Sequence, residues 1–245
     1  MKEVKERPFL VANGLADARI VPLQSGRNNH VWRVESEEGL FLLKSYRQSV
    51  DGEWDRLATE YQFLEILRDG GVRQVPKPVA QSKRDGLGLY TFLSGQPVER
   101  VTVDLVKQCA DFVIEVNDCQ KQESAGRFPV AADAHFDIQS HLSGVHSRLS
   151  LLRSIEVGEG LVCRFSTLIN SLVEALRKID KTLVKFAGME PSATDGVSAG
   201  RILSPSDFGF HNILEEDGVL CFLDFEYAGW DDPAKLICDF NCQPD

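Results

Sequence analysis

The stretch Ser204-Pro-Ser-Asp-Phe-Gly-Phe-His-Asn-Ile-Leu214 and the stretch Cys221-Phe-Leu-Asp-Phe-Glu226 together decide the fold of this chain. The first ends in residues typical of a strand, and the second continues a short apolar run that predicts the returning strand. Between them, Glu216-Asp-Gly218 is typical of a tight turn. We therefore expect a β-hairpin, which places the residues before its first strand beside those after its second.

Two carboxylates and an amide lie at that end of the predicted hairpin, namely Asp207, Asn212 and Asp224. All three carry hard oxygen ligands, which suit a Mg²⁺ ion that holds a polyphosphate. One carboxylate would remain to accept a proton from a hydroxyl group. The same residue types are common in turns, and the spacing Asp-x-x-x-x-Asn often arises by chance. The hypothesis therefore depends on whether the upstream sequence supplies the partners that such a site needs.

The composition excludes several classes of protein. With 245 residues the chain can form one large domain or two lobes that share a cleft, and its 43% apolar content is that of a globular protein. A net charge of −10 argues against a nucleic-acid partner, and it is compatible with a cationic or neutral small substrate. The N-terminus has no apolar run of the signal-peptide type, and no segment approaches a membrane span. We therefore expect no membrane partner and a cytoplasmic location.

The first part of the chain predicts a mainly β structure with one helix. Alternating apolar residues over residues 19–45 are typical of strands, and the last of these strands ends on Lys44. Residues 53–69 carry an apolar stripe at helical spacing, and residues 88–93 form a strand of the buried type. The pattern changes after that strand. We therefore assign residues 1–95 to an N-terminal lobe.

The rest of the chain predicts helices followed by the hairpin. Apolar residues recur at helical spacing over residues 102–120, 137–153 and 161–187. The hairpin region, residues 204–226, comes after them. We therefore assign residues 96–245 to a mainly helical C-terminal lobe that carries a catalytic hairpin, and the whole chain to the α+β class.

Together these features are what phosphoryl transfer from ATP needs: a polar loop that can lie over phosphates, a lysine on a strand, a glutamate on the next helix, and then Asp, Asn and Asp. The most specific motifs are Asp207-Phe-Gly-Phe-His-Asn212 and Leu223-Asp-Phe-Glu-Tyr-Ala-Gly229. On these motifs the chain resembles the aminoglycoside phosphotransferase family, a kinase-like group that phosphorylates hydroxyls of small molecules. The resemblance implies a two-lobed, protein-kinase-like fold with an antiparallel β N-lobe and a mainly helical C-lobe.

In the N-lobe the resemblance implies a nucleotide site. Lys44 would contact the α- and β-phosphates of ATP, and Glu60 on the following helix would orient it. Ser25, Gly26 and Asn29 belong to a short loop that would cover the phosphates. A glycine lets the backbone of such a loop approach closely, and successive N–H groups can bind anionic oxygen.

The adenine site and the transfer site are implied in the same way. Backbone groups near Thr91 and Leu93 lie where the family pairs the adenine edge with the segment that connects the lobes. Asp207 would be the catalytic base or the group that orients the hydroxyl, and Asn212 and Asp224 would hold Mg²⁺ against the β- and γ-phosphates. The implied cofactors are therefore ATP and Mg²⁺, and the implied partner is a small molecule with a hydroxyl group.

The chain departs from the family pattern in two places. Pro205 stands where the family usually has a histidine that braces the loop, although a proline can itself stiffen this backbone. The chain also stops at Asp245, where the family continues into further C-terminal helices. We expect either a truncation or an open acceptor side, and we favour truncation because the apolar stretch Leu236-Ile-Cys-Asp-Phe240 needs cover. Within that stretch, Asp239 matches a buried carboxylate that braces the catalytic loop in the family.

Two other functions remain open from the sequence. A catalytically weak or inactive pseudokinase, acting as a nucleotide-binding or interaction module, would agree with Pro205 and the missing C-terminal helices. A metal-dependent hydrolase would use the hairpin carboxylates but not the upstream lysine and glutamate. The sequence defines neither the acceptor nor the oligomeric state. Candidates for acceptor contacts are Asp133, His135 and Asp137, although a helix N-terminus favours aspartate in any case.

Overall fold

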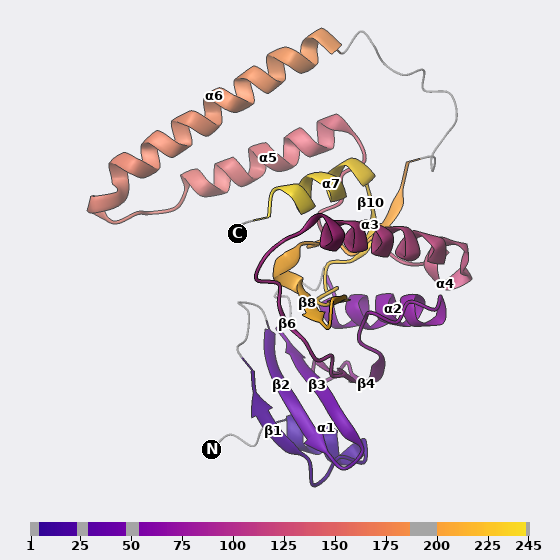
Figure 1. Cartoon of the computed structure of the whole chain (residues 1–245). Coiled ribbons are helices and arrows are strands. Elements are labelled where there is room, and N and C mark those ends of the chain that lie inside the picture. Colours follow the sequence, from indigo (N-terminus) through magenta and orange to yellow (C-terminus); the bar gives the residue numbers. More distant parts are fainter. Residues whose placement is uncertain (1–4, 24–28, 48–53, 187–199, 244–245) are drawn as a thin grey trace. The chain divides into compact units, whose positions relative to one another are not determined.

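The computed structural model describes residues 5–23, 29–47, 54–186 and 200–243. It contains two compact units (Figure 1): a main unit of residues 1–134 with 201–245, and a helical unit of residues 135–200. The helical unit is therefore an insertion in the sequence of the main unit. Both predicted lobes contribute residues to the main unit, so the predicted lobe boundary at residue 95 stays a prediction.

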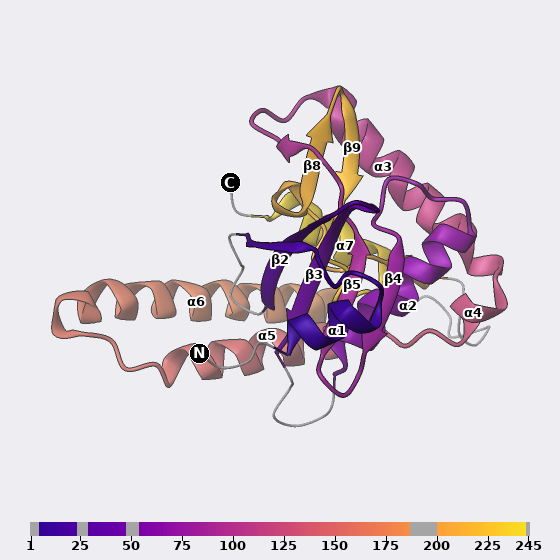
Figure 2. The same ribbon diagram turned by 90° about the horizontal axis from the view of Figure 1, so that it is seen from below.

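A five-stranded sheet forms the N-terminal part of the main unit (Figure 2). Its strands are antiparallel and lie in the order β1-β2-β3-β5-β4, with the bounds β1 Arg19–Pro22, β2 Asn29–Ser36, β3 Gly39–Tyr46, β4 Pro78–Ser82 and β5 Leu87–Thr91. Strands β3 and β5 pair so that Lys44 lies opposite Gly88, and Leu42 opposite Tyr90. Because alternate residues face opposite sides of a sheet, Lys44, Tyr46, Gly88 and Tyr90 share one face. The predicted antiparallel N-terminal sheet is confirmed.

The short helix α1 (Glu6–Ala12) covers the other face of this sheet. Its Leu10 is buried with Leu43 and Leu89, which alternate with Lys44 and Gly88 along their strands. The sequence pattern does not predict this helix. It has seven residues and no side-chain cap, which is too short for a recognisable helical period.

The helix α2 (Arg56–Asp69) confirms the helix predicted over residues 53–69. Asp55 is its N-cap and accepts a hydrogen bond from the N–H of Ala58. Its buried residues are mostly apolar, but Glu60 is among them and is only 2% exposed. The helix therefore carries a carboxylate into the interior, where it needs a partner.

The rest of the main unit consists of helices and short strands. Their bounds are α3 Val103–Asp118, α4 Glu123–Gly126, α7 Pro233–Asn241, β6 Gln96–Pro97, β7 Ile202–Ser204, β8 Ile213–Glu216, β9 Val219–Phe222 and β10 Gly229–Asp231, with 3-10 turns at Cys119–Lys121 and Phe210–Asn212. The predicted hairpin is confirmed as β8 and β9, which β6 extends, while β7 pairs with β10. At the hairpin turn Asp217 and Gly218 have φ angles of 51° and 81°. Two consecutive left-handed residues are typical of a type I′ turn.

Aromatic packing joins the helices of the main unit to the hairpin. Phe112 of α3 stacks on Phe222 of β9 with ring centroids 3.8 Å apart, and Phe63 of α2 lies 5.3 Å from Phe225. All four rings are buried. Because protein interiors are close-packed, this cluster fixes the segment after β9 relative to α2, and so positions Asp224 near that helix.

The helical unit is a pair of helices joined by a short turn, with the bounds α5 Ile138–Arg153, 3-10 turn Glu159–Leu161 and α6 Val162–Phe186. Both helices were predicted by their apolar spacing and are confirmed. Their shared buried core is small and consists of Leu149, Ile169 and Leu176. Within the residues that the structure describes, no helix combines the length and the apolar character that a membrane span requires.

Candidate active site

A cleft of about 840 Å³ opens between the N-terminal sheet and the hairpin segment of the main unit. Every predicted site residue that the structure describes lines it: Asn29, Lys44, Glu60, Thr91, Leu93, Asp207, Asn212 and Asp224. Ser25 and Gly26, the other two, lie outside the described residues. The fold therefore gathers at one place side chains that are far apart in the sequence.

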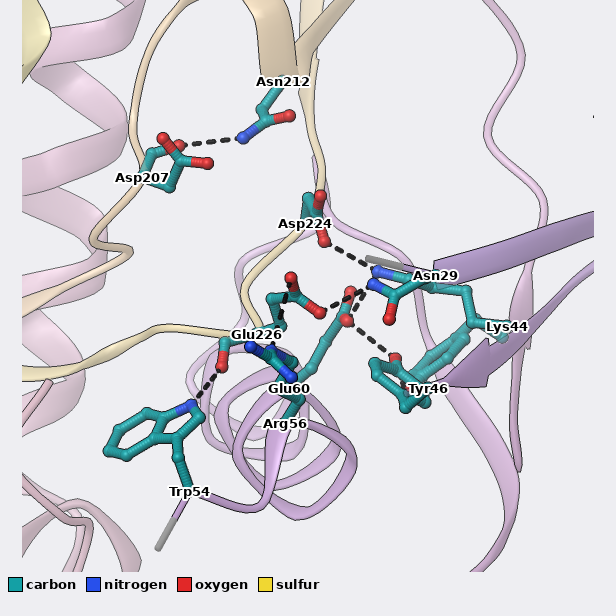
Figure 3. Close-up of polar contacts among 11 residues, drawn as sticks. Asn29, Lys44, Tyr46, Trp54, Arg56, Glu60, Asp207, Asn212, Asp224 and Glu226 are labelled. Atoms are coloured by element: carbon teal, nitrogen blue, oxygen red, sulfur yellow. Dashed lines mark hydrogen bonds and ion pairs between the residues drawn. The ribbon is translucent and has the colours of Figure 1, made fainter. Parts of the chain in front are cut away.

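Lys44 is the centre of the polar contacts in this cleft (Figure 3). Its Nζ donates to Glu60 Oε2 at 2.6 Å and to Asp224 Oδ1 at 2.8 Å. The side chains of Lys44 and Glu60 are 6% and 3% exposed, whereas that of Asp224 is 39% exposed. The structure thus brings together a lysine from β3, a glutamate from α2 and an aspartate from the hairpin. Their roles toward a ligand stay predictions.

Burial and charge act in opposite directions on this cluster. Burial lowers the pKa of Lys44, but the negative charges of Glu60 and Asp224 outweigh it and raise that pKa above its ordinary value. Burial raises the pKa of Glu60, and the ammonium of Lys44 opposes the rise. Lys44 is therefore a fixed positive charge at neutral pH, and it lines the cleft where an anionic ligand would meet it.

Asp207 and Asn212 lie in the segment that leads from β7 into the hairpin. The side-chain N–H of Asn212 donates to the Asp207 carbonyl at 2.9 Å, which leaves the Asn212 amide oxygen for another partner (Figure 3). His211 Nε2 lies 3.3 Å from Asp207 Oδ1. The side chains of Asp207 and His211 are 46% and 36% exposed. A bound molecule can therefore reach the Asp207 carboxylate.

The backbone is strained at both segments that carry these carboxylates. Ser206 and Asp224 have φ angles of 61° and 64°, in the left-handed region that non-glycine residues rarely adopt. The N–H of Ser206 donates to Ser204 Oγ at 3.0 Å, which stabilises the turn ahead of Asp207. Pro205 is buried in this turn, and its ring fixes φ there. Such strained residues cost about 1–3 kcal/mol each and concentrate at functional sites.

The oxygen donors at this end of the cleft fit a Mg²⁺ ion. The Asn212 amide is oriented by its bond to the backbone, and Asp224 offers a partly exposed carboxylate. Mg²⁺ prefers such ligands and usually takes the remainder from phosphate and water. Among the described residues, no group of three or more His, Cys, Asp or Glu side chains could hold a metal. The chain therefore offers an amide and a carboxylate, and a phosphate would complete the site.

Glu226 is a residue of the cleft that the sequence patterns do not single out. Its Oε2 accepts a hydrogen bond from Asn29 Nδ2 at 2.6 Å, and its carbonyl accepts one from Trp54 Nε1 at 2.8 Å. Arg56 Nε lies 3.8 Å from its other carboxylate oxygen. A side-chain N–H of Asn29 is therefore already hydrogen-bonded to a carboxylate of the protein. The sequence holds a clue, since Glu226 follows Asp224 by two residues within the motif of the hairpin.

Thr91 and Leu93 lie on the wall of the cleft where the adenine base is predicted. The N–H of Thr91 donates to the Lys77 carbonyl, and its hydroxyl accepts from the Lys77 N–H, both at 2.9 Å. The N–H of Phe92 donates to the Leu40 carbonyl at 3.1 Å. These two N–H groups are therefore already bonded within the protein, and pairing of the adenine edge near Thr91 and Leu93 stays a prediction.

The prediction that Asp239 is a buried brace is wrong. Its side chain is 38% exposed and accepts a hydrogen bond from Lys235 Nζ at 2.6 Å. The buried carboxylate is Asp231, which is 0% exposed and lies 3.1 Å from the same ammonium. Asp231 belongs to the paired strand β10, whereas Asp239 lies on α7, one turn beyond Lys235. Strand pairing, which the sequence pattern does not reveal here, decides which carboxylate is buried.

Asp137 has a structural partner of its own. It is the N-cap of α5 and accepts a hydrogen bond from the N–H of Ser140 at 2.8 Å, and this bond lowers the pKa of its carboxyl. The helix start accounts for the aspartate without a ligand. Acceptor contacts by Asp133, His135 and Asp137 stay predictions.

The sequence has a family match that covers most of the chain. Residues 19–235 match the model of the family described as "Phosphotransferase enzyme family". No curated protein sequence matches this chain significantly.

Several solved structures share the fold. Spectinomycin phosphotransferase APH(9)-Ia, in complex with ADP and spectinomycin, is 14% identical with a TM-score of 0.57, and the match covers 88% of this chain and 65% of that one. Choline kinase from Cryptosporidium parvum Iowa II is 13% identical with a TM-score of 0.57, and the match covers 98% and 64%. A thermostable mutant of aminoglycoside phosphotransferase APH(4)-Ia, with ADP and hygromycin B, is 13% identical with a TM-score of 0.59, and the match covers 96% and 76%.

The likeness to these structures confirms the predicted α+β, kinase-like fold. At such identities it shows the fold alone. The chain spans about 65% of the length of the spectinomycin phosphotransferase and about 64% of that of the choline kinase.

Proposed function

The chain belongs to the phosphotransferase enzyme family, and we propose that it moves the γ-phosphate of ATP to a hydroxyl of a small molecule in the presence of Mg²⁺. One observation carries the proposal. The ammonium of Lys44 lies in a cleft, bonded at 2.6 Å to Glu60 and at 2.8 Å to Asp224. Phosphoryl transfer leaves little covalent chemistry for the protein and depends on positioning and on charge. A buried lysine held between two carboxylates supplies both the positioning and the positive charge.

The nucleotide would lie with its phosphates at Lys44 and its base at the wall near Thr91 and Leu93. The ammonium of Lys44 balances the charge of the α- and β-phosphates, and Glu60 holds that ammonium in place. Two of the solved structures that share this fold contain ADP, which supports a nucleotide as the occupant of the cleft.

The phosphate-covering loop would complete this half of the site. Ser25 and Gly26 would offer backbone N–H groups to the phosphates. Asn29 would act mainly as the anchor of the loop, because its side-chain N–H is bonded to the buried carboxylate of Glu226 at 2.6 Å.

Asn212 and Asp224 would hold the Mg²⁺ ion. Such an ion, when bound, would supply positive charge against the charge of the transferred group. The chain contributes the orientation of both ligands. The Asp207 carbonyl fixes the amide of Asn212, and Lys44 fixes one carboxylate oxygen of Asp224.

Asp207 would orient the acceptor hydroxyl and accept its proton. Its carboxylate lines the cleft and is 46% exposed, so an incoming hydroxyl can reach it. A strong base is not required, because the loose transition state develops little charge on the attacking oxygen early in the reaction. His211, at 3.3 Å, would keep the carboxylate turned in one direction.

The acceptor we propose is of the amino-sugar, sugar or amino-alcohol type. The similar solved structures include a spectinomycin phosphotransferase and a choline kinase. The net charge of −10 favours cationic or neutral acceptors over anionic ones.

The test is a transfer assay with Mg-ATP and a panel of amino-sugars, sugars and amino alcohols. We expect one class of acceptor to gain a phosphoryl group by mass spectrometry, with matching release of ADP. Asp207→Asn is the control and should slow transfer by about 10³ while keeping nucleotide binding. Binding of ATP without transfer to any acceptor would contradict the proposal and favour a nucleotide-binding module without catalytic activity.

A further inference from the structure

Two buried tyrosines lie behind the Lys44–Glu60 pair. The hydroxyl of Tyr46 donates to Glu60 Oε2 at 2.6 Å, and the hydroxyls of Tyr46 and Tyr90 are 2.7 Å apart. Tyr46 is 5% exposed and Tyr90 is 1% exposed. Tyr90 also lines the cleft, directly before Thr91 in the sequence. The two rings therefore connect the wall of the cleft to the carboxylate that holds Lys44.

The direction of this hydrogen-bond chain follows from the protons available. Tyr46 has a single hydroxyl proton, and the carboxylate of Glu60 takes it. The oxygen of Tyr46 must therefore accept from Tyr90. Burial raises the pKa of both hydroxyls well above the ordinary value, and the charge of Glu60 adds to the rise, so both stay protonated. The hydrogen-bond chain therefore runs, from donor to acceptor, from Tyr90 to Tyr46 to Glu60.

The sheet is built to accommodate this chain. Lys44, Tyr46 and Tyr90 share one face of the sheet, and so does Gly88, which is paired with Lys44. A Cβ atom at Gly88 would lie 2.5 Å from the hydroxyl of Tyr90. A side chain at this position would push Tyr90 out of place. The glycine therefore makes room for the first member of the chain.

We propose that Tyr46 is a positioning residue for the lysine of the nucleotide site, and that Tyr90 sets the direction of the Tyr46 hydroxyl. This inference rests on the proposed function. Glu60 Oε2 accepts from Lys44 and from Tyr46, so Tyr46 determines where that oxygen lies. The link makes the wall of the cleft and the phosphate-binding ammonium parts of one rigid unit.

Loss of the Tyr46 hydroxyl changes how Lys44 is held. Glu60 is buried, and without the tyrosine it loses one of its two donors. The oxygen Oε2 is then held by the ammonium alone, so the carboxylate and Lys44 can shift together away from the sheet position that Tyr46 defines. An ammonium that is no longer held at one position is misplaced for the phosphates.

The experiment compares Mg-ADP with adenosine by isothermal titration calorimetry on the full chain. Adenosine lacks the phosphates and does not reach Lys44, so its affinity reports only the base site. Tyr46→Phe should weaken Mg-ADP about tenfold, because the ammonium of Lys44 is no longer held at the position that the phosphates require. Tyr90→Phe should weaken it less, since Tyr46 still reaches Glu60. Adenosine should bind all forms equally.

Tyr61→Phe is the matched control. Tyr61 lies on α2 with its ring 6.0 Å from that of Tyr90, and its hydroxyl makes no hydrogen bond within the described part of the chain. The same chemical change there should leave both affinities unchanged. Thermal melts identify a variant that fails to fold. If Tyr46→Phe does not fold, the Mg-ADP affinity of Tyr90→Phe tests the inference.

The outcomes separate the inference from the function on which it rests. Unchanged Mg-ADP binding by Tyr46→Phe, or equal losses for Mg-ADP and adenosine, overturns the positioning role. A larger loss of Mg-ADP affinity in Tyr90→Phe than in Tyr46→Phe overturns the direction of the hydrogen-bond chain. A wild-type protein that binds neither ligand overturns the proposed function and the inference with it.

Discussion

The two ends of the cleft are held by different physical means. At the end where we propose that the phosphate donor binds (the donor end), Lys44 and Glu60 are 6% and 3% exposed and are fixed by buried, charge-assisted hydrogen bonds. At the end where we propose that the hydroxyl acceptor binds (the acceptor end), Asp207 and His211 are 46% and 36% exposed, and the local backbone positions them. The ion pairs of Lys44 are formed at one end without a ligand, and the other end is open to solvent.

The difference in exposure between the two ends predicts which function each end can perform alone. A buried cation between carboxylates is preorganised for a charged ligand and needs little rearrangement when it binds. An exposed carboxylate gains its full effect only when a substrate excludes water around it. Substitutions at the two ends should therefore separate binding and stability from turnover.

Asp207→Asn should show most clearly that the two ends of the cleft have separate effects on turnover and on nucleotide binding. The amide has the same shape but cannot accept the hydroxyl proton, so kcat should fall by about 10³. Affinity for Mg-ADP and the melting temperature should not change, because the donor end does not include this carboxylate. Steady-state kinetics and calorimetry measure the two effects. A parallel loss of Mg-ADP binding would mean that the two ends are not separate.

Glu60→Ala breaks the donor end and leaves Lys44 buried with one partner. The free energy of unfolding should fall by about 3 kcal/mol, since the buried charge of Lys44 is then compensated by Asp224 alone. Urea denaturation provides the measurement. Glu65→Ala, an exposed position on the same helix, is the control and should stay within about 0.5 kcal/mol of the wild type. Equal stability of the two variants would show that the pair does not stabilise the fold.

Gly88→Ala should disturb the donor end from the sheet side. The new Cβ lies 2.5 Å from the Tyr90 hydroxyl, and overpacking of this kind typically destabilises a protein by about 1–3 kcal/mol. Gly126→Ala is the matched control, because a Cβ there meets nothing within 4 Å. Thermal melts of both variants test the expectation. A loss of stability in Gly126→Ala alone would contradict the packing described for Tyr90.

His211→Gln should have the smallest effect of the series. Exposed ion pairs are worth about 0.2–1 kcal/mol, so kcat should change by less than about fivefold. The contact of His211 with Asp207 is of this exposed kind. A loss of kcat as large as that of Asp207→Asn, measured with the same acceptor, would instead make the histidine part of the catalytic machinery.

Much of the fold could be predicted from the sequence because its longer elements have clear periods. Alternation defines β2 and β3, and helical spacing defines α2, α5 and α6. The helix α1 and the paired strands β7 and β10 could not be predicted. A helix of seven residues and strands of three residues are too short to show a periodic pattern. The pairing of β10 also explains why the buried carboxylate is Asp231 and not Asp239.

The candidate site could be predicted only in part, for a related reason. The order of Lys44, Glu60 and the hairpin residues along the chain suggested a shared cleft. The bond between Asn29 and Glu226 joins residues 197 positions apart, and the bond between Tyr46 and Tyr90 depends on strand register. No local pattern encodes such contacts, because they arise from packing between elements.

A Mg-nucleotide site at the donor end would make ADP binding depend on Mg²⁺, and titrations of ADP with and without Mg²⁺ into wild type and Asp224→Asn measure that dependence. Asparagine tolerates the left-handed conformation of this position, φ 64°, and the Lys44–Glu60 pair is retained. We predict that Mg²⁺ strengthens ADP binding at least about tenfold in the wild type and has no effect in the variant. Equal Mg²⁺ dependence in both proteins, or none in either, would contradict a Mg-nucleotide site at Asp224.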